Sequence, residues 1–204
     1  MLQAQDLAAR RGDATLFSGI GFSLSPGSAL IVGGPNGSGK TTLLRILAGL
    51  VHPTRGTVAW RGAEVGSLDP VLRAQALFIG HAAALKDELT AEENLASLTS
   101  LHGVQANPAE LADALASWAL SRQHALPARV LSQGQRRRVA LARLALLPRA
   151  LWLLDEPATA LDDAGVARLR EAIAAHLAGG GIAVIATHQE LALPAGASQP
   201  LHLA

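Results

Sequence analysis

The sequence predicts an α/β fold built on a mostly parallel β-sheet, with an antiparallel β layer and a helical insertion. Short apolar runs alternate with helical stretches along most of the chain, a pattern typical of such sheets. The run Ala29–Val32 ends in a glycine-rich turn, and a helical pattern follows over Lys40–Leu50. Between about residue 82 and residue 142 no strand is predicted, which indicates that the helical insertion lies there.

Apolar runs also predict the remaining strands. Leu151–Leu154 and Ile182–Ala186 are expected to be buried strands of the main sheet, joined through a helix over roughly Gly165–Leu177. The antiparallel layer is expected to contain Leu2–Leu7, Ile20–Leu24 and Thr57–Trp60. We expect a single domain over residues 1–204, with its core at residues 1–81 and 143–204 and a helical subdomain at about 82–142.

Helix starts within the insertion are predicted from capping residues. Each candidate N-cap lies three positions before a Glu or Gln that completes a capping box. The three pairs are Thr90 with Glu93, Asn107 with Glu110, and Ser132 with Gln135. Pro108 also fits the first helical position after Asn107.

Composition excludes several classes of protein. The chain has 204 residues, 50% of them hydrophobic, so it is long and apolar enough to form a folded core. Its net charge of +1 gives no electrostatic footprint for nucleic acid. The absence of cysteine excludes disulfides and thiolate chemistry. No apolar stretch approaches the roughly 20 residues that span a bilayer, so we expect a soluble cytoplasmic chain.

Residues 34–41 match the Walker A pattern in full and lie between a predicted strand and helix. The glycines let backbone N–H groups point at phosphate, and the helix N-terminus adds its dipole. We expect Lys40 to reach the β- and γ-phosphates of ATP and the Thr41 hydroxyl to bind Mg²⁺. A glycine-rich surface turn is the alternative, which this context disfavours. The expected ATP-binding residues are Gly34, Pro35, Asn36, Gly37, Ser38, Gly39, Lys40, Thr41 and Thr42.

Two adjacent carboxylates end the predicted strand Leu151–Leu154. Asp155 is expected to hold Mg²⁺, directly or through water, and Glu156 to polarise the water that attacks ATP. The alternative is a strand end with two solvated acids and a proline stop at Pro157. The Walker A pattern in the same chain favours the catalytic interpretation.

Three further motifs resemble those of ABC-transporter ATPases, and the resemblance covers nearly the whole chain. Leu131–Gln135 resembles the signature sequence, and its Gly134 lies 21 positions before Asp155, a typical spacing for that family. Ala160–Asp162 resembles the D-loop, and His188 resembles the switch histidine. The resemblance implies ATP hydrolysis by a P-loop NTPase (RecA-like) core, with Glu156 and His188 in catalytic roles.

The signature implies a second copy of the chain. In the family, two subunits pack head to tail, and each signature closes on the γ-phosphate held by the other. The resemblance therefore assigns Ser132, Gly134 and Gln135 to ATP bound in a dimer. A capping box alone accounts for Ser132 and Gln135, but not for a glycine inside a helix, which costs about 1 kcal/mol relative to alanine.

Two positions depart from the family pattern. At the position of the aromatic residue that stacks on adenine in the family we expect Arg11, with Phe17 as the rival candidate. The Q-loop position, where family members have glutamine, is His81. An imidazole there is able to position water or sense the γ-phosphate, and the alternative is a half-exposed loop histidine.

The motif around His81 narrows the resemblance. Together with Leu89–Leu95, Arg137–Arg143, Leu151–Pro157 and Thr187–Gln189, it resembles the ATPase subunit of the haem exporter of cytochrome c maturation. This implies separate multi-spanning membrane subunits, a location at the cytoplasmic face of the bacterial inner membrane, and no direct contact with haem. The cargo itself is not readable from the residues.

Other functions compete with this one. The chain could serve a different ABC transporter. It could also be a mechanical ABC ATPase, but such proteins carry long coiled coils between their motif halves, and only about 90 residues separate Thr41 from Leu131. A P-loop kinase with an accidental signature is the third alternative, and it would use a second substrate.

Overall fold

The computed structural model describes residues 1–194 and 196–204, and these form two compact units. Unit 1 comprises residues 1–80, 149–156 and 173–204, and unit 2 comprises residues 81–148 and 157–172. The model contains both a parallel and an antiparallel sheet together with helices, so the predicted fold class is confirmed.

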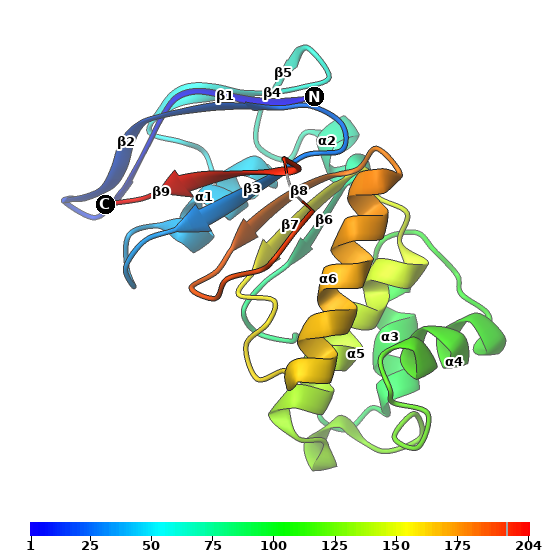
Figure 1. The fold of residues 1–204 in the computed structure, drawn as a ribbon. Coiled ribbons are helices and arrows are strands. Elements are labelled where there is room, and N and C mark those ends of the chain that lie inside the picture. The colour runs from blue at the N-terminus through cyan, green and yellow to red at the C-terminus, as the bar shows by residue number, and fades with distance from the viewer. Residues whose placement is uncertain (195) are drawn as a thin grey trace. The chain divides into compact units, whose positions relative to one another are not determined.

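The larger sheet of unit 1 is parallel, with the strand order β6–β7–β8–β3–β9 (Figure 1). Its strands are β3 (Ala29–Gly33), β6 (Ala76–Ile79), β7 (Leu151–Asp155), β8 (Ile182–Ala186) and β9 (Ser198–His202). Every residue of β7 and β8 is buried, which explains why both are continuous apolar runs in the sequence. β9 was not predicted, because it is mostly exposed and contains Pro200.

The helix after the glycine-rich turn is shorter than predicted. α1 spans Lys40–Leu47 and does not continue to Leu50. Gly49 adopts a φ of 68°, its N–H donates to the Ile46 carbonyl, and the Leu50 N–H donates to the Arg45 carbonyl. These two bonds form a Schellman motif, which ends the helix at the position where a left-handed residue is needed.

A second, antiparallel sheet in unit 1 has the order β2–β1–β4–β5. Its strands are β1 (Leu2–Arg11), β2 (Ala14–Leu24), β4 (Arg55–Trp60) and β5 (Ala63–Val65). The three predicted strands are present but longer than expected, because the β1–β2 hairpin continues to its turn with exposed residues on both strands. β5, β6 and the short helix α2 (Pro70–Gln75) were not predicted.

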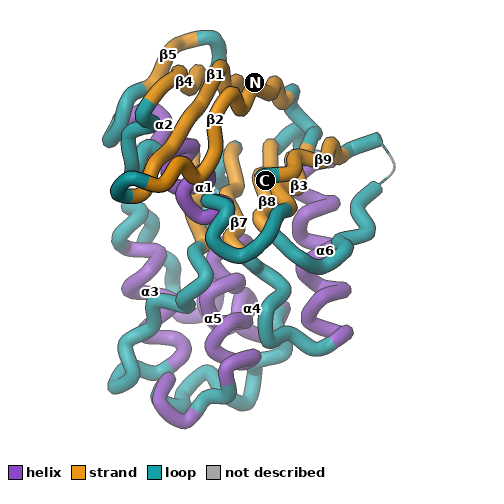
Figure 2. Tube along the Cα trace, turned by 90° about the vertical axis from the view of Figure 1, so that its left-hand side faces the viewer, coloured by secondary structure: helices purple, strands orange, loops and turns teal. Residues whose placement is uncertain are grey.

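Unit 2 is helical. Its elements are α3 (Ala91–Ser100), α4 (Pro108–Ser117), the 3₁₀ turn η1 (Ala128–Val130) and α5 (Gln133–Leu146), and α6 (Asp163–Ala178) begins in this unit and ends in unit 1. Helices α3, α4 and α5 pack against one another (Figure 2). Residues 82–142 are all described, and their only β pairing is an isolated bridge between Thr90 and Pro127.

All three predicted capping boxes are formed. The side chains of Thr90, Asn107 and Ser132 each accept a hydrogen bond from the backbone N–H three residues later. The Glu or Gln at that position bonds back to the N-cap N–H in each case. Each of these caps stabilises its helix by about 1 kcal/mol.

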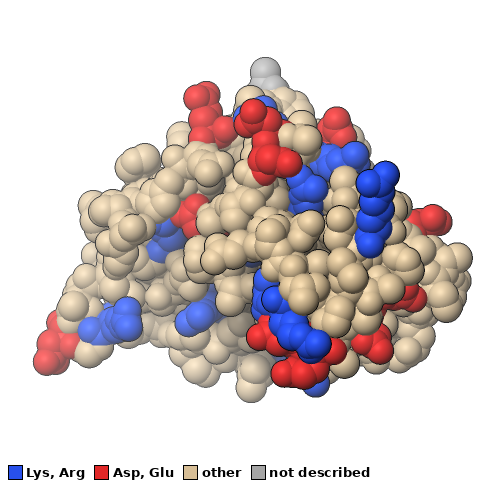
Figure 3. All heavy atoms as spheres, turned by 90° about the horizontal axis from the view of Figure 1, so that it is seen from below, with Lys and Arg blue, Asp and Glu red and all other residues tan. Residues whose placement is uncertain are grey.

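On the face drawn in Figure 3, acidic and basic side chains are interspersed among other residues. No large patch on this face carries charges of only one sign. This matches the near-neutral composition. Among the described residues, no helix has both the length and the hydropathy that a bilayer crossing requires.

A histidine of α6 packs flat against a tryptophan of the parallel sheet. The rings of Trp152 and His176 lie 3.9 Å apart between centroids, with an interplanar angle of 5°. His176 Nε2 also lies 3.1 Å from the Ile182 carbonyl oxygen, so the ring donates there. Burial lowers the pKa of His176 below its ordinary value, because the imidazolium loses hydration, and the bond to Ile182 opposes this only in part.

We predict that unit 1 loses stability as the pH falls. The pKa of His176 is lower in the folded state, so the unfolded chain binds the proton more readily. The free energy of unfolding therefore decreases as the pH falls through the ordinary histidine pKa of about 6.5. Thermal unfolding at pH 7.5 and pH 5.5 measures the loss. In His176→Phe, which keeps a stacked ring but does not titrate, the loss should be smaller, whereas the exposed control His52→Gln should behave like the parent chain. An equal acid effect in His176→Phe would contradict the assignment.

Candidate functional site

The phosphate loop has a backbone conformation that only glycine tolerates. Gly34, Gly37 and Gly39 adopt φ values of 134°, 88° and 98°. A Cβ on Gly34 would lie 2.4 Å from the Leu203 carbonyl oxygen, and one on Gly39 would lie 2.9 Å from the Phe17 ring. The loop is therefore held by close packing as well as by its own turns.

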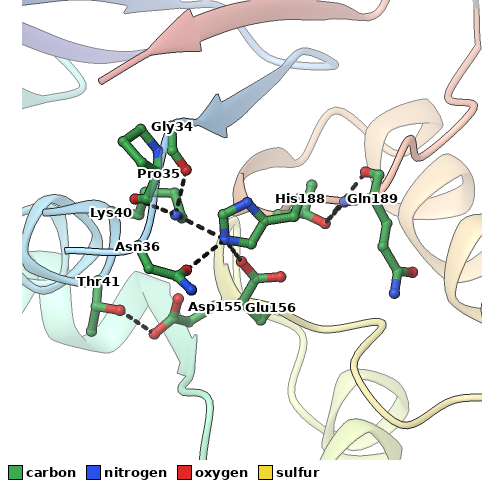
Figure 4. Close-up of polar contacts among 10 residues, drawn as sticks. Gly34, Pro35, Asn36, Lys40, Thr41, Asp155, Glu156, His188 and Gln189 are labelled. Carbon is green, nitrogen blue, oxygen red and sulfur yellow. Dashed lines mark hydrogen bonds and ion pairs between the residues drawn. The ribbon is translucent and has the colours of Figure 1, made fainter. Parts of the chain in front are cut away.

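Lys40 holds the loop from inside. Lys40 is buried, with an exposed fraction of 8%. Its Nζ donates to the carbonyl oxygens of Gly34 at 2.7 Å and Pro35 at 3.1 Å (Figure 4). Nζ also lies 3.1 Å from His188 Nε2. An ammonium has three protons to donate, so an arriving phosphate must compete for one of these contacts.

The Thr41 hydroxyl and the Asp155 carboxylate meet at the end of β7. Thr41 Oγ1 donates to Asp155 Oδ2 at 2.8 Å, and Asp155 is 2% exposed. A hydroxyl beside a buried carboxylate is the oxygen donor set that Mg²⁺ prefers when phosphate oxygens supply further ligands. Among the described residues, no group of three or more His, Asp or Glu could hold a metal without such help.

A buried hydroxyl in the loop has no partner in the protein. Ser38 Oγ is inaccessible and makes no hydrogen bond, and Ser38 lies in the phosphate loop two residues before α1 begins. A buried hydroxyl without a partner costs free energy unless a ligand satisfies it. This atom therefore fits a loop that binds an anion.

Three side chains converge on one ring nitrogen. His188 Nε2 lies 3.1 Å from Lys40 Nζ, 3.0 Å from Asn36 Oδ1 and 3.3 Å from Glu156 Oε1 (Figure 4). A neutral imidazole nitrogen either accepts a hydrogen bond, as Lys40 requires, or donates one, as the oxygens of Asn36 and Glu156 require. If Lys40 no longer donated to His188 Nε2, this nitrogen would be able to donate a hydrogen bond to Glu156 Oε1.

Glu156 has a left-handed backbone conformation, with a φ of 48°, which is uncommon for this residue type. Its N–H donates to the Ala186 carbonyl at 2.8 Å, which fixes the residue beside the end of β8. The carboxylate lies beside His188, with Oε1 3.3 Å from Nε2.

The signature residues lie at the start of α5 in unit 2. Ser132 Oγ accepts from the Gln135 N–H at 3.2 Å, and Gln135 Oε1 accepts from the Ser132 N–H at 2.9 Å. Both side chains thus serve the capping box. Gly134 has a separate reason to be glycine, because a Cβ there would lie 2.6 Å from the Ala160 carbonyl oxygen.

The remaining predicted residues are placed as follows. Arg11 ends β1 and is exposed, whereas Phe17 is only 6% exposed and packs against Gly39. Of the two, Arg11 is the one with a face available to a base. His81 is exposed in unit 2, and its backbone oxygen accepts from Arg137 Nη1 at 3.2 Å.

The sequence did not reveal the role of Arg137 or of Leu203. Arg137 is 4% exposed, and its Nε donates to the Pro157 carbonyl at 3.1 Å. Leu203 supplies the carbonyl oxygen against which Gly34 packs. Leu203 lies in no motif, and Arg137 opens the Arg137–Arg143 motif without its contacts being predicted.

Comparison with known proteins agrees with this geometry. The ABC transporter family model matches residues 17–159, which is more than half of the chain. The protein named cytochrome c biogenesis ATP-binding export protein CcmA 2, from Cupriavidus metallidurans, is 51% identical over 94% of this chain and 90% of its own length. The CcmA protein of Nitrosospira multiformis is 46% identical over 99% of this chain and 98% of its own length.

Solved structures show the same fold. An ABC transporter ATP-binding protein from Pyrococcus furiosus superposes with a TM-score of 0.83, at 26% identity, over 99% of this chain and 96% of its own. A dimeric ATP-binding cassette, bound to ADP and Pi in a post-hydrolysis state, superposes with a TM-score of 0.80, at 25% identity, over 93% of this chain and 88% of its own.

The chain belongs to the ABC transporter family, as an ATPase subunit. Within that family, it groups with the cytochrome c biogenesis ATP-binding export proteins CcmA, to which it is similar over nearly its whole length.

We predict that Lys40→Ala and Ser132→Ala affect different steps. Lys40 shapes the loop that binds phosphate within one copy, so Lys40→Ala should weaken ATP binding by tenfold or more, about the free energy of one charge-assisted hydrogen bond. Ser132→Ala should leave binding to one copy within about threefold and lower the hydrolysis rate instead. Calorimetric titration with ATP, together with phosphate release, separates the two effects. Equal loss of binding in both variants would be inconsistent with these roles.

Proposed function

We propose that this chain is the ATP-hydrolysing subunit of the haem exporter used in cytochrome c biogenesis. The observation that carries this proposal is the similarity to proteins named CcmA, at 46–51% identity over at least 94% of the chain for the two described above. The phosphate loop and its neighbouring acids supply the chemistry that such a subunit needs. ATP hydrolysis itself follows from membership of the family.

In this proposal, one set of residues binds the phosphates and Mg²⁺, and a second set activates the attacking water. The backbone of residues 34–39, Lys40 and the Ser38 hydroxyl bind the phosphates. Thr41 and Asp155 would hold Mg²⁺, which would neutralise phosphate charge when bound. Glu156 orients the attacking water. His188 contacts both Glu156 and Lys40, so the contacts of Glu156 depend on whether phosphate is bound to Lys40.

We further propose that hydrolysis requires a head-to-tail dimer. Ser132 and Gly134 of one copy would face the γ-phosphate bound by the other, with the free N–H groups at the start of α5 directed at it. The dimeric ATP-binding cassette among the similar structures supports a dimer for this fold. Gln135 would contribute by holding Ser132 in place through the capping box.

The membrane-spanning part of the exporter is proposed to be a separate chain. The relatives are named export proteins, which implies transport across a membrane. This chain aligns with 90% and 98% of the length of the two relatives described above. We place the subunit at the cytoplasmic face of the bacterial inner membrane, where ATP is available. His81 is proposed to link the nucleotide state to the membrane partner, and Arg11 to stack on adenine.

We predict that Glu156→Gln forms a stable dimer in the presence of ATP. The substitution removes the carboxylate that orients water but retains the shape of the side chain, so ATP should remain in the interface. Light scattering with saturating ATP should report twice the mass of the monomer. Glu171→Gln, which removes an exposed carboxylate of α6, is the matched control and should behave as the parent chain. A Glu156→Gln chain that stays monomeric would exclude the dimer mechanism.

We predict that deletion of the gene abolishes c-type cytochromes and leaves b-type cytochromes, which need no haem attachment across the membrane. A haem stain of membrane and periplasmic proteins measures the first, and reduced-minus-oxidised spectra measure the second. The parent chain should restore staining, whereas Glu156→Gln and Lys40→Ala should not, because transport needs turnover. Normal staining in the deletion strain would assign the chain to a different ABC transporter.

A further inference from the structure

The signature helix α5 holds the segment Pro157–Asp162, which follows the catalytic carboxylate in the sequence. Three contacts between α5 and this segment are present within unit 2. Gly134 approaches the Ala160 carbonyl, Arg137 Nε donates to the Pro157 carbonyl at 3.1 Å, and Arg138 Nη2 pairs with Asp162 Oδ1 at 2.5 Å. One helix thus fixes the beginning, middle and end of this segment.

The approach at Gly134 is too close for any other residue. The Cβ of an alanine would lie 2.6 Å from the Ala160 oxygen, which is backbone and therefore unable to move away cheaply. Ala160 itself has a φ of 64°, so its carbonyl is aimed at the helix by an uncommon backbone conformation. This contact explains a glycine that costs about 1 kcal/mol in helix propensity.

The third contact is the ion pair between Arg138 and Asp162. The Arg138 side chain is 16% exposed and the Asp162 side chain 65% exposed. The hydrogen bond from Arg138 lowers the pKa of Asp162 below its ordinary value, and the bond from the Gly165 N–H adds to this effect. Because that N–H lies at the start of α6, Asp162 Oδ1 joins α5 to α6 through a single atom.

We propose that Arg138 is a positioning residue for ATP hydrolysis, acting through Asp162 to hold the segment Ala160–Asp162 and the signature as one rigid surface. This proposal rests on the proposed head-to-tail dimer, in which the signature of one copy faces the γ-phosphate bound by the other, and the segment packs directly against that signature. If the segment were free to move against α5, each encounter would have to order it at an entropic cost. A segment ordered in advance avoids that cost in the hydrolysing state.

The test compares three variants of the full chain. Arg138→Gln removes the charge and the fork of donors, and Asp162→Asn removes the acidic charge but keeps an oxygen that caps α6. Arg136→Gln is the matched control, because Arg136 lies on the same helix and forms a comparable ion pair at 2.6 Å, but with Asp87, and its other bond goes to the Ala128 carbonyl. Phosphate release at saturating ATP is divided by the number of ATP sites found by titration, which removes any loss due to misfolding.

We expect Arg138→Gln and Asp162→Asn each to lower this normalised rate about tenfold, a typical coupling within one ion-pair network, and to leave the ATP dissociation constant within about twofold. The double variant should lose no more than either single one, because both act through the same contact. Arg136→Gln should stay within about twofold of the parent chain. Multiplicative losses in the double variant, an unchanged rate in Arg138→Gln, or an equal loss in Arg136→Gln would each overturn the proposal.

Failure of the underlying dimer would have a different signature. If Glu156→Gln does not dimerise with ATP while the parent chain hydrolyses ATP, the dimer proposal fails regardless of the Arg138 result. If Glu156→Gln dimerises and Arg138→Gln keeps its full normalised rate, only the role of Arg138 is excluded. Arg138→Lys gives a further check, since it keeps the charge but not the forked geometry, and it should recover only part of the rate.

Discussion

The contacts of one buried ammonium determine the shape of the nucleotide site. Lys40 donates to two carbonyls of the phosphate loop and lies against His188, so loop conformation and the histidine depend on the same cation. A buried charge must be satisfied, and here the loop backbone does so before any phosphate arrives. A phosphate that bound Lys40 would exchange with one of these partners, and its binding free energy would be a difference between two sets of hydrogen bonds.

That exchange has a consequence for catalysis. His188 Nε2 cannot accept from Lys40 and donate to Glu156 at the same time. If a phosphate oxygen replaced His188 at Lys40, the ring nitrogen would be able to donate toward Asn36 or Glu156. The contacts of Glu156 would then depend on the proposed binding of nucleotide at Lys40.

Two separate reasons favour glycine at position 134 in unit 2. The resemblance assigned Gly134 to phosphate recognition, and a helix N-terminus without a Cβ is suited to that role. The structure adds a second requirement, because the Ala160 carbonyl occupies the space of a side chain at Gly134. A substitution at this position would disturb both the start of α5 and the segment that contains Ala160.

The sequence by itself determined the elements whose signal is local: the buried strands β7 and β8, the three capping boxes, and the phosphate loop with its strand and helix. Apolar runs, cap residues and glycine spacing depend on neighbours only a few positions away. Tertiary structure decided the exposed strand β9, the contact of Leu203 with Gly34, and the convergence of Asn36, Lys40 and Glu156 on His188. Asn36 and His188 are 152 positions apart in the sequence, and such pairings arise only when the sheet brings the ends of β3, β7 and β8 to one edge.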